Sequence, residues 1–144
     1  MTEYASALAR LTAFFEALTP QTLPQLAQVY AADARFKDPF NDVQGHAAII
    51  RIFEHMFVKL SEPRFMVLER MAQGEQAFLT WELHFSFARW PAGHQVIRGA
   101  THVRFDAAGR VVLHRDYWDA AEELYEKIPL LGALMRALKR AANG

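Results

Sequence analysis

The spacing of apolar residues changes once along this chain, near residue 61, and that change most constrains the fold. Before it, apolar side chains recur every three or four residues, which is the spacing of amphipathic helices. After it, apolar and polar residues alternate up to about residue 118, which is the spacing of strands. Helices first and strands afterwards predict an α+β domain.

Three helices are predicted before the change. The first covers 3–18, the second begins at Thr22 and includes Tyr30 on its buried face, and the third covers about 46–60. Each has one apolar stripe. Between the second and third helices, the segment from Ala34 to Phe40 is expected to form one short extended piece.

Four strands are predicted after the change, joined by short turns rich in Gly, Asp and Pro. They cover 64–71, 76–89, 94–105 and 110–118. Short turns between consecutive strands predict an antiparallel meander. This sheet must curl over the long first and third helices to bury their apolar faces, which predicts a cone open at one end.

A helical extension, 119–144, is predicted beyond the sheet. Asp119 is expected to cap its first piece, and Pro129 interrupts it. The second piece, 130–142, is amphipathic and is expected to pack over the body of the domain or the cavity mouth. The whole chain, 1–144, is predicted to be one domain.

Charge and composition exclude several classes of function. The chain has 16 Lys and Arg against 16 Asp and Glu, which gives no electrostatic reason to bind nucleic acid or an anionic membrane. It has no cysteine, which excludes disulfides, thiol catalysis and thiolate metal sites. No apolar run approaches membrane-spanning length and no signal segment is evident. We therefore expect a cytoplasmic protein without a cofactor.

The order of elements and several motifs resemble the nuclear transport factor 2-like superfamily, also called the SnoaL-like or ketosteroid-isomerase-like fold. The motifs lie at 30–39, 45–49, 105–111 and 114–119. The resemblance covers essentially the whole chain and implies a conical sheet wrapped over the N-terminal helices. It says little about function, because this fold hosts isomerases, hydrolases, cyclases, dehydratases and non-enzymatic binding domains.

Steroid isomerases of this superfamily have a general-base aspartate in the same Asp-Pro context, and Asp38 falls on it. The resemblance places Phe14 and Thr101 where that family has its two oxyanion-hole donors. Phe14 cannot donate a hydrogen bond, and such donors contribute a few kcal/mol to catalysis. Steroid isomerisation in its usual form is therefore not expected.

Limonene-epoxide-hydrolase-like proteins offer a second resemblance, in the last strand, where Asp116 falls on a catalytic aspartate. The other catalytic positions of that family fall on Glu82, His84, Phe36 and Asp38. The arginine and the water-holding tyrosine of that family are thus absent at these positions.

The strand over 76–89 allows two interpretations. Its odd positions are mostly apolar and its even positions mostly polar, so the odd face is either the core or an outer surface. If the even face is the inner one, Glu82 and His84 line a polar pocket. The odd residues would then form a homodimer interface on the outer face of the sheet. That interface would consist of Trp81, Leu83, Phe85 and Phe87.

In the second interpretation a polar cluster forms in an apolar pocket. Asp38 is the predicted general base, with Asp116 and His84 as its catalytic partners, since clustered carboxylates raise one another's pKa. The predicted substrate-binding residues are Phe14, Phe36, Phe53, Phe57, Glu82, Thr101, His114 and Trp118. The structural alternative pairs His84 with Glu82 or Asp116, and Asp116 with an arginine.

Two functions remain open from sequence. The first is an isomerase, hydrolase or cyclase that uses acid and base chemistry on a small apolar carbonyl or epoxide compound. The second is a non-catalytic ligand-binding or dimerisation domain. No short metal-ligand motif such as HExxH is present, so no metal is expected. In both cases we expect a homodimer through the outer sheet face.

Overall fold

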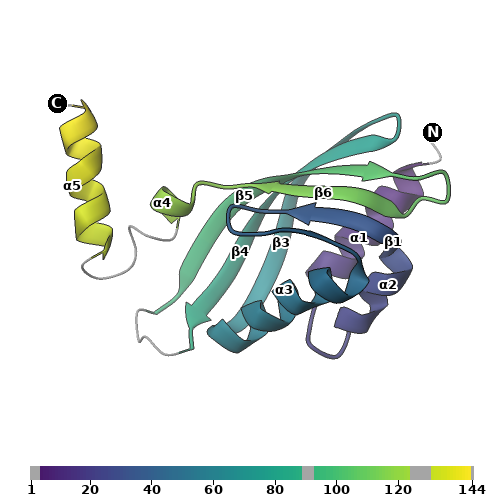
Figure 1. The fold of residues 1–144 in the computed structure, drawn as a ribbon, viewed down its shortest axis with the longest axis horizontal. Helices are drawn as coiled ribbons and strands as arrows, with labels where there is room; N and C mark the ends of the chain where they lie inside the picture. Colours follow the sequence, from purple (N-terminus) through teal and green to yellow (C-terminus); the bar gives the residue numbers. More distant parts are fainter. Residues whose placement is uncertain (1–3, 89–92, 124–130, 144) are drawn as a thin grey trace.

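The computed structural model describes residues 4–88, 93–123 and 131–143. Its helical elements are α1 (Tyr4–Glu16), the 3-10 turn η1 (Leu23–Gln25), α2 (Leu26–Val29), α3 (His46–Lys59), α4 (Ala120–Glu123) and α5 (Leu131–Asn143). Its strands are β1 (Tyr30–Lys37), β2 (Asp42–Gln44), β3 (Leu60–Gln73), β4 (Gln76–Phe87), β5 (Gln95–Phe105) and β6 (Val111–Tyr117). The predicted α+β order is confirmed (Figure 1).

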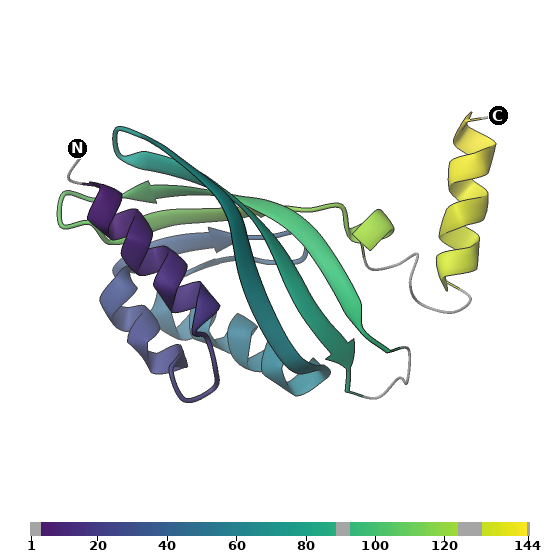
Figure 2. The same cartoon turned by 180° about the vertical axis from the view of Figure 1, so that it is seen from behind.

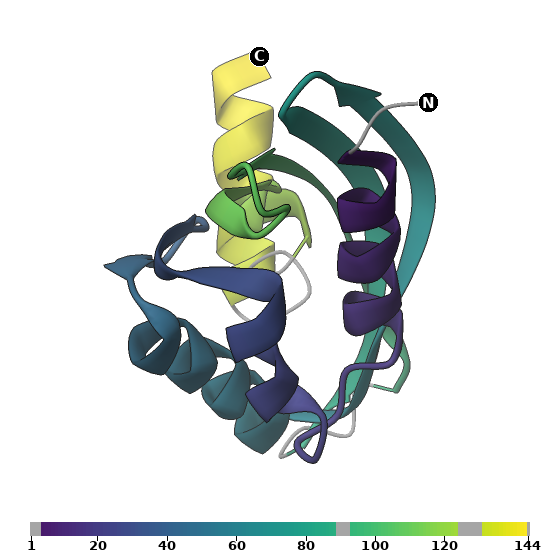
Figure 3. The same cartoon turned by 90° about the vertical axis from the view of Figure 1, so that its right-hand side faces the viewer.

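The strands form one sheet in the order β2-β1-β6-β5-β4-β3. β3 to β6 make the predicted antiparallel meander. The sheet bends around the space that α1, α2 and α3 fill, with α1 lying against β3 (Figure 3). This bend gives the predicted conical shape, because a twisted sheet can cover helices on one face only by curling over them.

The segment after the second helix is longer and more regular than predicted. β1 begins at Tyr30, which we had placed on the preceding helix, and runs to Lys37. It pairs antiparallel with β2 and parallel with β6, so the sheet is mixed. The sequence could not reveal this pairing, because β1 and β6 lie more than 70 residues apart along the chain.

The core lies between the helices and the concave face of the sheet. α1 buries one stripe that includes Leu8, Leu11 and Phe15, as its spacing predicts. Leu11, Leu26 and Ile49, one from each of the three N-terminal helices, have no exposed surface. The inner positions of β4, among them Leu79 and Trp81, complete this core.

The C-terminal extension departs from the prediction. Asp119 does cap α4, since its Oδ1 accepts the backbone N–H groups of Ala121 and Glu122. The interruption predicted at Pro129 lies outside the described residues. α5, however, lies beyond α4 and away from the sheet and from α1–α3 (Figures 1 and 2). It does not pack over the body of the domain (Figures 1 and 2), and more than half of the surface of Leu134 and Leu138 is exposed.

Candidate functional site

A cavity of about 310 Å³ lies under the concave face of the sheet. Its walls are mainly aromatic and aliphatic, and a chamber of about 30 Å³ lies deeper, behind Phe53, Phe65 and Trp81. The residues that line the cavity and are also exposed, Phe40, His55 and Lys59 among them, mark its mouth. A volume near 300 Å³ with few polar groups is typical of a site for a small apolar molecule.

β6 supplies the buried polar groups of this site. Because side chains alternate along a strand, His114 and Asp116 both point to the concave face. His114 is 2% exposed, and Asp116 lines both the deep chamber and the larger cavity. β5 places Thr101 directly opposite Asp116.

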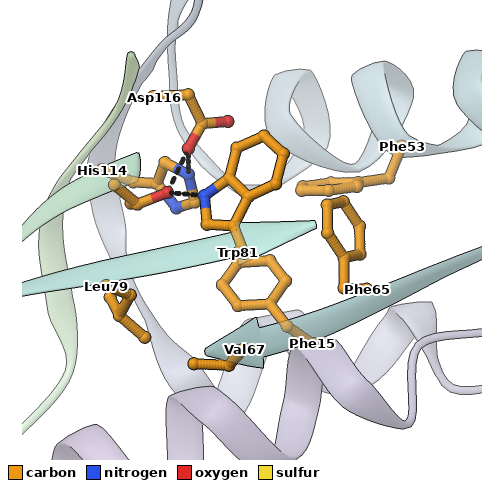
Figure 4. A pocket seen from close by; sticks show the side chains of 9 residues that line it. Phe15, Phe53, Phe65, Val67, Leu79, Trp81, His114 and Asp116 are labelled. Atoms are coloured by element: carbon orange, nitrogen blue, oxygen red, sulfur yellow. Dashed lines mark hydrogen bonds and ion pairs between the residues drawn. The ribbon is translucent and has the colours of Figure 1, made fainter. Parts of the chain in front are cut away.

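These side chains form a connected hydrogen-bond relay (Figure 4). The Tyr30 hydroxyl lies 2.6 Å from Nδ1 of His114, and Nε2 of His114 lies 2.6 Å from Oδ1 of Asp116. The Thr101 hydroxyl lies 2.6 Å from the same oxygen, and Nε1 of Trp81 lies 2.7 Å from that hydroxyl. The relay therefore runs from Tyr30 to Trp81 and is centred on Asp116.

The direction of each bond follows from what each group can donate. The indole N–H of Trp81 can only donate, so the Thr101 hydroxyl accepts it and gives its own proton to Oδ1 of Asp116. If the Tyr30 hydroxyl donates to Nδ1 of His114, a neutral imidazole carries its proton on Nε2 and donates to the same Oδ1. Both donors thus converge on one oxygen of Asp116.

The second oxygen of Asp116, Oδ2, receives no hydrogen bond from any residue the structure describes. Figure 4 shows it turned away from the two bonds that hold Oδ1. The relay fixes the orientation of the carboxylate through one oxygen and leaves the other free to take a proton. That division suits a general base.

Tyr30 stays protonated in this arrangement. Burial raises the pKa of its hydroxyl well above the ordinary value, and the negative charge of Asp116 raises it further. A phenol that keeps its proton can act as a fixed donor to His114.

We expect Tyr30→Phe to destabilise the fold by about 1–3 kcal/mol at pH 7, because Nδ1 of His114 loses its partner in a buried site.

The raised pKa of Tyr30 also predicts that the stability of the wild type depends on pH. Above pH 10 the unfolded chain can ionise this phenol and the folded chain cannot, so wild-type stability should fall as pH rises past 10. Urea unfolding between pH 8 and 11 would measure both effects. The stability difference between wild type and Tyr30→Phe should shrink with rising pH, and a constant difference would contradict this account.

The structure brings together most of the predicted site residues. Those that line the cavity or its deep chamber are Phe36, Asp38, Phe53, Thr101, His114, Asp116 and Trp118. Phe14 and Phe57 do not. Phe14 is buried against Phe15 and Tyr30, and Phe57 faces a separate hollow beside Pro20 and Pro24.

Glu82 and His84 do not converge with Asp116. Trp81, Leu83 and Phe85 are at most 8% exposed, so the odd face of β4 is the core and the even face is the outer one. On that outer face Nε2 of His84 lies 3.0 Å from Oε1 of Glu82. The interpretation that the even face lines the pocket is wrong, and so is the proposed interface, because its residues belong to the core.

Asp38 lies at the mouth of the cavity, in the turn between β1 and β2. Its Oδ1 accepts the backbone N–H of Phe40 at 2.8 Å and that of Asn41 at 2.7 Å. The side-chain amide of Asn41 donates to the same oxygen at 3.0 Å. The carboxylate is therefore turned into its own loop, and its predicted role as the base is left untested.

The site includes Tyr30, Trp81 and Phe65, which the sequence patterns do not predict as site residues. Tyr30 is expected on a helix, and Trp81 has two possible positions in its strand. Phe65, which packs on Trp81 with ring centres 5.7 Å apart, has no predicted role. For Trp81 the signal is present, since a strand whose odd positions are mostly apolar most often turns them to the core.

Among the described residues, no group of three or more His, Cys, Asp or Glu side chains could hold a metal ion. No described helix is long and apolar enough to span a membrane.

Comparison with known proteins identifies the class. The SnoaL-like domain family matches residues 11–114, so the chain belongs to that family. None of the curated proteins compared with the chain matches it. The fold is the nuclear transport factor 2-like fold, as the resemblance implied.

Solved structures share this fold at low sequence identity. An NTF2-like protein of unknown function from Burkholderia pseudomallei is 20% identical, with a TM-score of 0.72 over 85% of this chain and 95% of its own. A limonene-epoxide-hydrolase-like epoxide hydrolase from Mycobacterium tuberculosis is 16% identical, with a TM-score of 0.71 over 96% and 99%. TerC, crystallised with polyporic acid, is 15% identical, with a TM-score of 0.71 over 84% and 95%. Proteins of this fold thus include enzymes and proteins of unknown function.

Proposed function

We propose that this protein is an acid–base enzyme that acts on a small apolar carbonyl compound, with Asp116 as the general base. The observation that carries the proposal is the carboxylate itself. It lies in an apolar cavity and is held through Oδ1 by Thr101 and His114, whereas no described residue donates a hydrogen bond to its Oδ2. A fixed carboxylate in such a cavity can remove a proton from carbon next to a carbonyl group.

The proposed step balances without a cofactor. Oδ2 of Asp116 takes the proton from the carbon next to the carbonyl, and the electron pair moves to the carbonyl oxygen to form an enolate. The same carboxyl group then returns a proton to carbon. His55 and Lys59 line the mouth end of the cavity and could face the enolate oxygen. Isomerisation and cyclisation of carbonyl compounds both begin with this step.

The carbonyl and the epoxide alternatives are not equally supported. Epoxide hydrolysis needs a water held and activated beside the epoxide, and among the described residues that line the cavity and its deep chamber there is no arginine to pair with Asp116. The M. tuberculosis epoxide hydrolase and TerC support a small-molecule site on this fold, but at 16% and 15% identity they support no particular substrate for this chain.

The test uses 2-tetralone, a two-ring ketone whose proton between the ring and the carbonyl is readily removed. In D₂O the wild-type protein should accelerate replacement of that proton by deuterium, because the carboxyl group of Asp116 exchanges its own proton with the solvent. Proton NMR follows the loss of the signal. If 2-tetralone binds and exchanges no faster than in buffer, the protein is a non-catalytic ligand-binding domain toward such ketones.

We also propose that two copies associate through the convex outer face of the sheet. The exposed apolar residues that this face carries are Met66, Met71, Phe78 and Tyr117. Exposed apolar side chains on one face of a sheet favour self-association. Sedimentation at micromolar concentration should show a dimer, and Phe78→Glu should weaken association on the order of tenfold or more. A wild-type monomer would contradict the proposal.

A further inference from the structure

The turn between β1 and β2 lies beside the end of β6, at the mouth of the cavity. In the parallel pairing Phe36 is opposite His114 and Lys37 is opposite Arg115. The chain that follows Lys37 therefore continues alongside Asp116 and Trp118. Asp38, Phe40, Asn41 and Trp118 all line the cavity together with Asp116.

Two aromatic rings meet across this mouth. Phe40 extends from the turn, and its ring centre lies 5.6 Å from that of Trp118, with the rings at 76° to each other. Half of the surface of Phe40 is exposed, at 52%, so its place is not set by burial in the core. Edge-to-face contacts of this kind are worth about 0.5–1.5 kcal/mol, which alone is a weak restraint.

The backbone that carries Phe40 is held by Asp38. Oδ1 of Asp38 accepts the N–H groups of both Phe40 and Asn41, and the backbone N–H of Asp38 donates to the carbonyl oxygen of Asn41 at 2.9 Å. Pro39 fixes its own φ between them. A carboxylate that accepts backbone hydrogen bonds from the residues two and three positions further along closes a tight turn.

We propose that Asp38 is a positioning residue, and that it holds Phe40 against Trp118 as an aromatic clamp over the mouth of the cavity. The clamp would grip a planar apolar ligand whose reacting carbon lies against Asp116. This inference rests on the proposed function only in taking the cavity as the ligand site. It assigns Asp38 a role different from that of the base, which is Asp116.

The experiment measures how fast a bound ligand leaves, and it needs no turnover. The probe is 2-naphthol, a planar two-ring phenol whose own fluorescence reports its release in stopped flow. Asp38→Ala and Phe40→Ala should each raise the dissociation rate about tenfold, since the turn loses several hydrogen bonds or the ring they hold. Asp38→Asn should restore a rate within about twofold of wild type, because the amide oxygen can accept the same two backbone N–H groups.

The control is Asp33→Ala, because Asp33 is an exposed aspartate on β1, the strand that leads into this turn. It should leave the dissociation rate unchanged. Hydrogen exchange gives a readout without ligand. The amides of Phe40 and Asn41 should lose protection in Asp38→Ala and keep it in Asp38→Asn.

The outcomes separate this inference from the proposed function. If wild type binds 2-naphthol and Asp38→Ala releases it at the wild-type rate, the clamp is rejected and the role of Asp116 is untouched. If Asp38→Asn stops exchange of 2-tetralone and Asp116→Asn leaves it at the wild-type rate, Asp38 is the base and both proposals fail. If wild type does not bind 2-naphthol, the cavity is not a site for planar apolar ligands and both are rejected.

Discussion

Asp116→Asn is expected to slow deuterium exchange of 2-tetralone by about 10²–10⁴-fold, the usual contribution of a general base. The amide keeps an oxygen that can accept from Thr101 and His114, so the relay can persist. It lacks the negative charge and cannot take the proton. The loss should appear in the rate at saturating 2-tetralone, since the cavity walls that bind it are unchanged.

Two controls keep this result interpretable. Asp33→Asn removes the same charge from an exposed position on β1 and should leave the exchange rate at the wild-type value. The second control uses Tyr30, because the charge of Asp116 contributes to its raised pKa. In Asp116→Asn the pKa of Tyr30 should fall toward its ordinary value, and ultraviolet absorbance of the phenolate would record this change. If Asp116→Asn exchanges 2-tetralone at the wild-type rate, Asp116 is not the base.

Gly99→Ala is expected to destabilise the fold by about 1–3 kcal/mol, as overpacking of a filled core does. Gly99 lies opposite Trp81 in the pairing of β4 with β5. A methyl group placed on Gly99 would lie 2.5 Å from two carbons of the Trp81 indole. The indole would have to move, which would break its 2.7 Å bond to Thr101 and deform the wall between the cavity and its deep chamber.

A double-mutant cycle tests the cause of that effect. In a Trp81→Phe background the smaller ring leaves room for the methyl group, so Gly99→Ala should cost much less there than in wild type. Urea unfolding of the four proteins gives the coupling free energy. If Gly99→Ala costs the same in both backgrounds, the contact with the indole is not what makes glycine necessary. Because Gly99 has an ordinary φ, backbone strain does not offer a competing explanation.

The face of β4 illustrates what alternation can and cannot predict. The sequence showed two faces, one apolar and one polar, but it allowed either to be the inner one. The pattern favours neither face as the inner one, and the predicted site places Glu82 and His84 in the pocket. An apolar face of β4 can be buried either under the sheet, by the helices, or outside it, by a second copy of the chain. The alternation alone therefore does not say which face is the inner one. The helices make the choice, because Phe15 and Phe53 occupy the concave side and need apolar partners there.

The relay shows a different limit. His114 and Asp116 are both predicted site residues, and both line the deep chamber. Their partners could not be predicted, because Tyr30 lies 84 residues from His114 and Thr101 lies 15 residues from Asp116. The first contact depends on the packing of β1 against β6, and the second on the register of β5 against β6. A hydrogen bond forms only when such registers bring two polar groups within about 3 Å.

By itself the sequence determined the α+β order, the limits of the long helices and the four-stranded meander. These depend on local periodicity, which each segment carries without reference to the others. Only the tertiary structure decided that β1 pairs parallel with β6, that Trp81 is inside and Glu82 outside, and that Asp38 bonds to its own turn. Each of these depends on which segments of the chain pack together. Burial of the apolar faces of α1 and α3 under the sheet supplies the free energy that favours this packing.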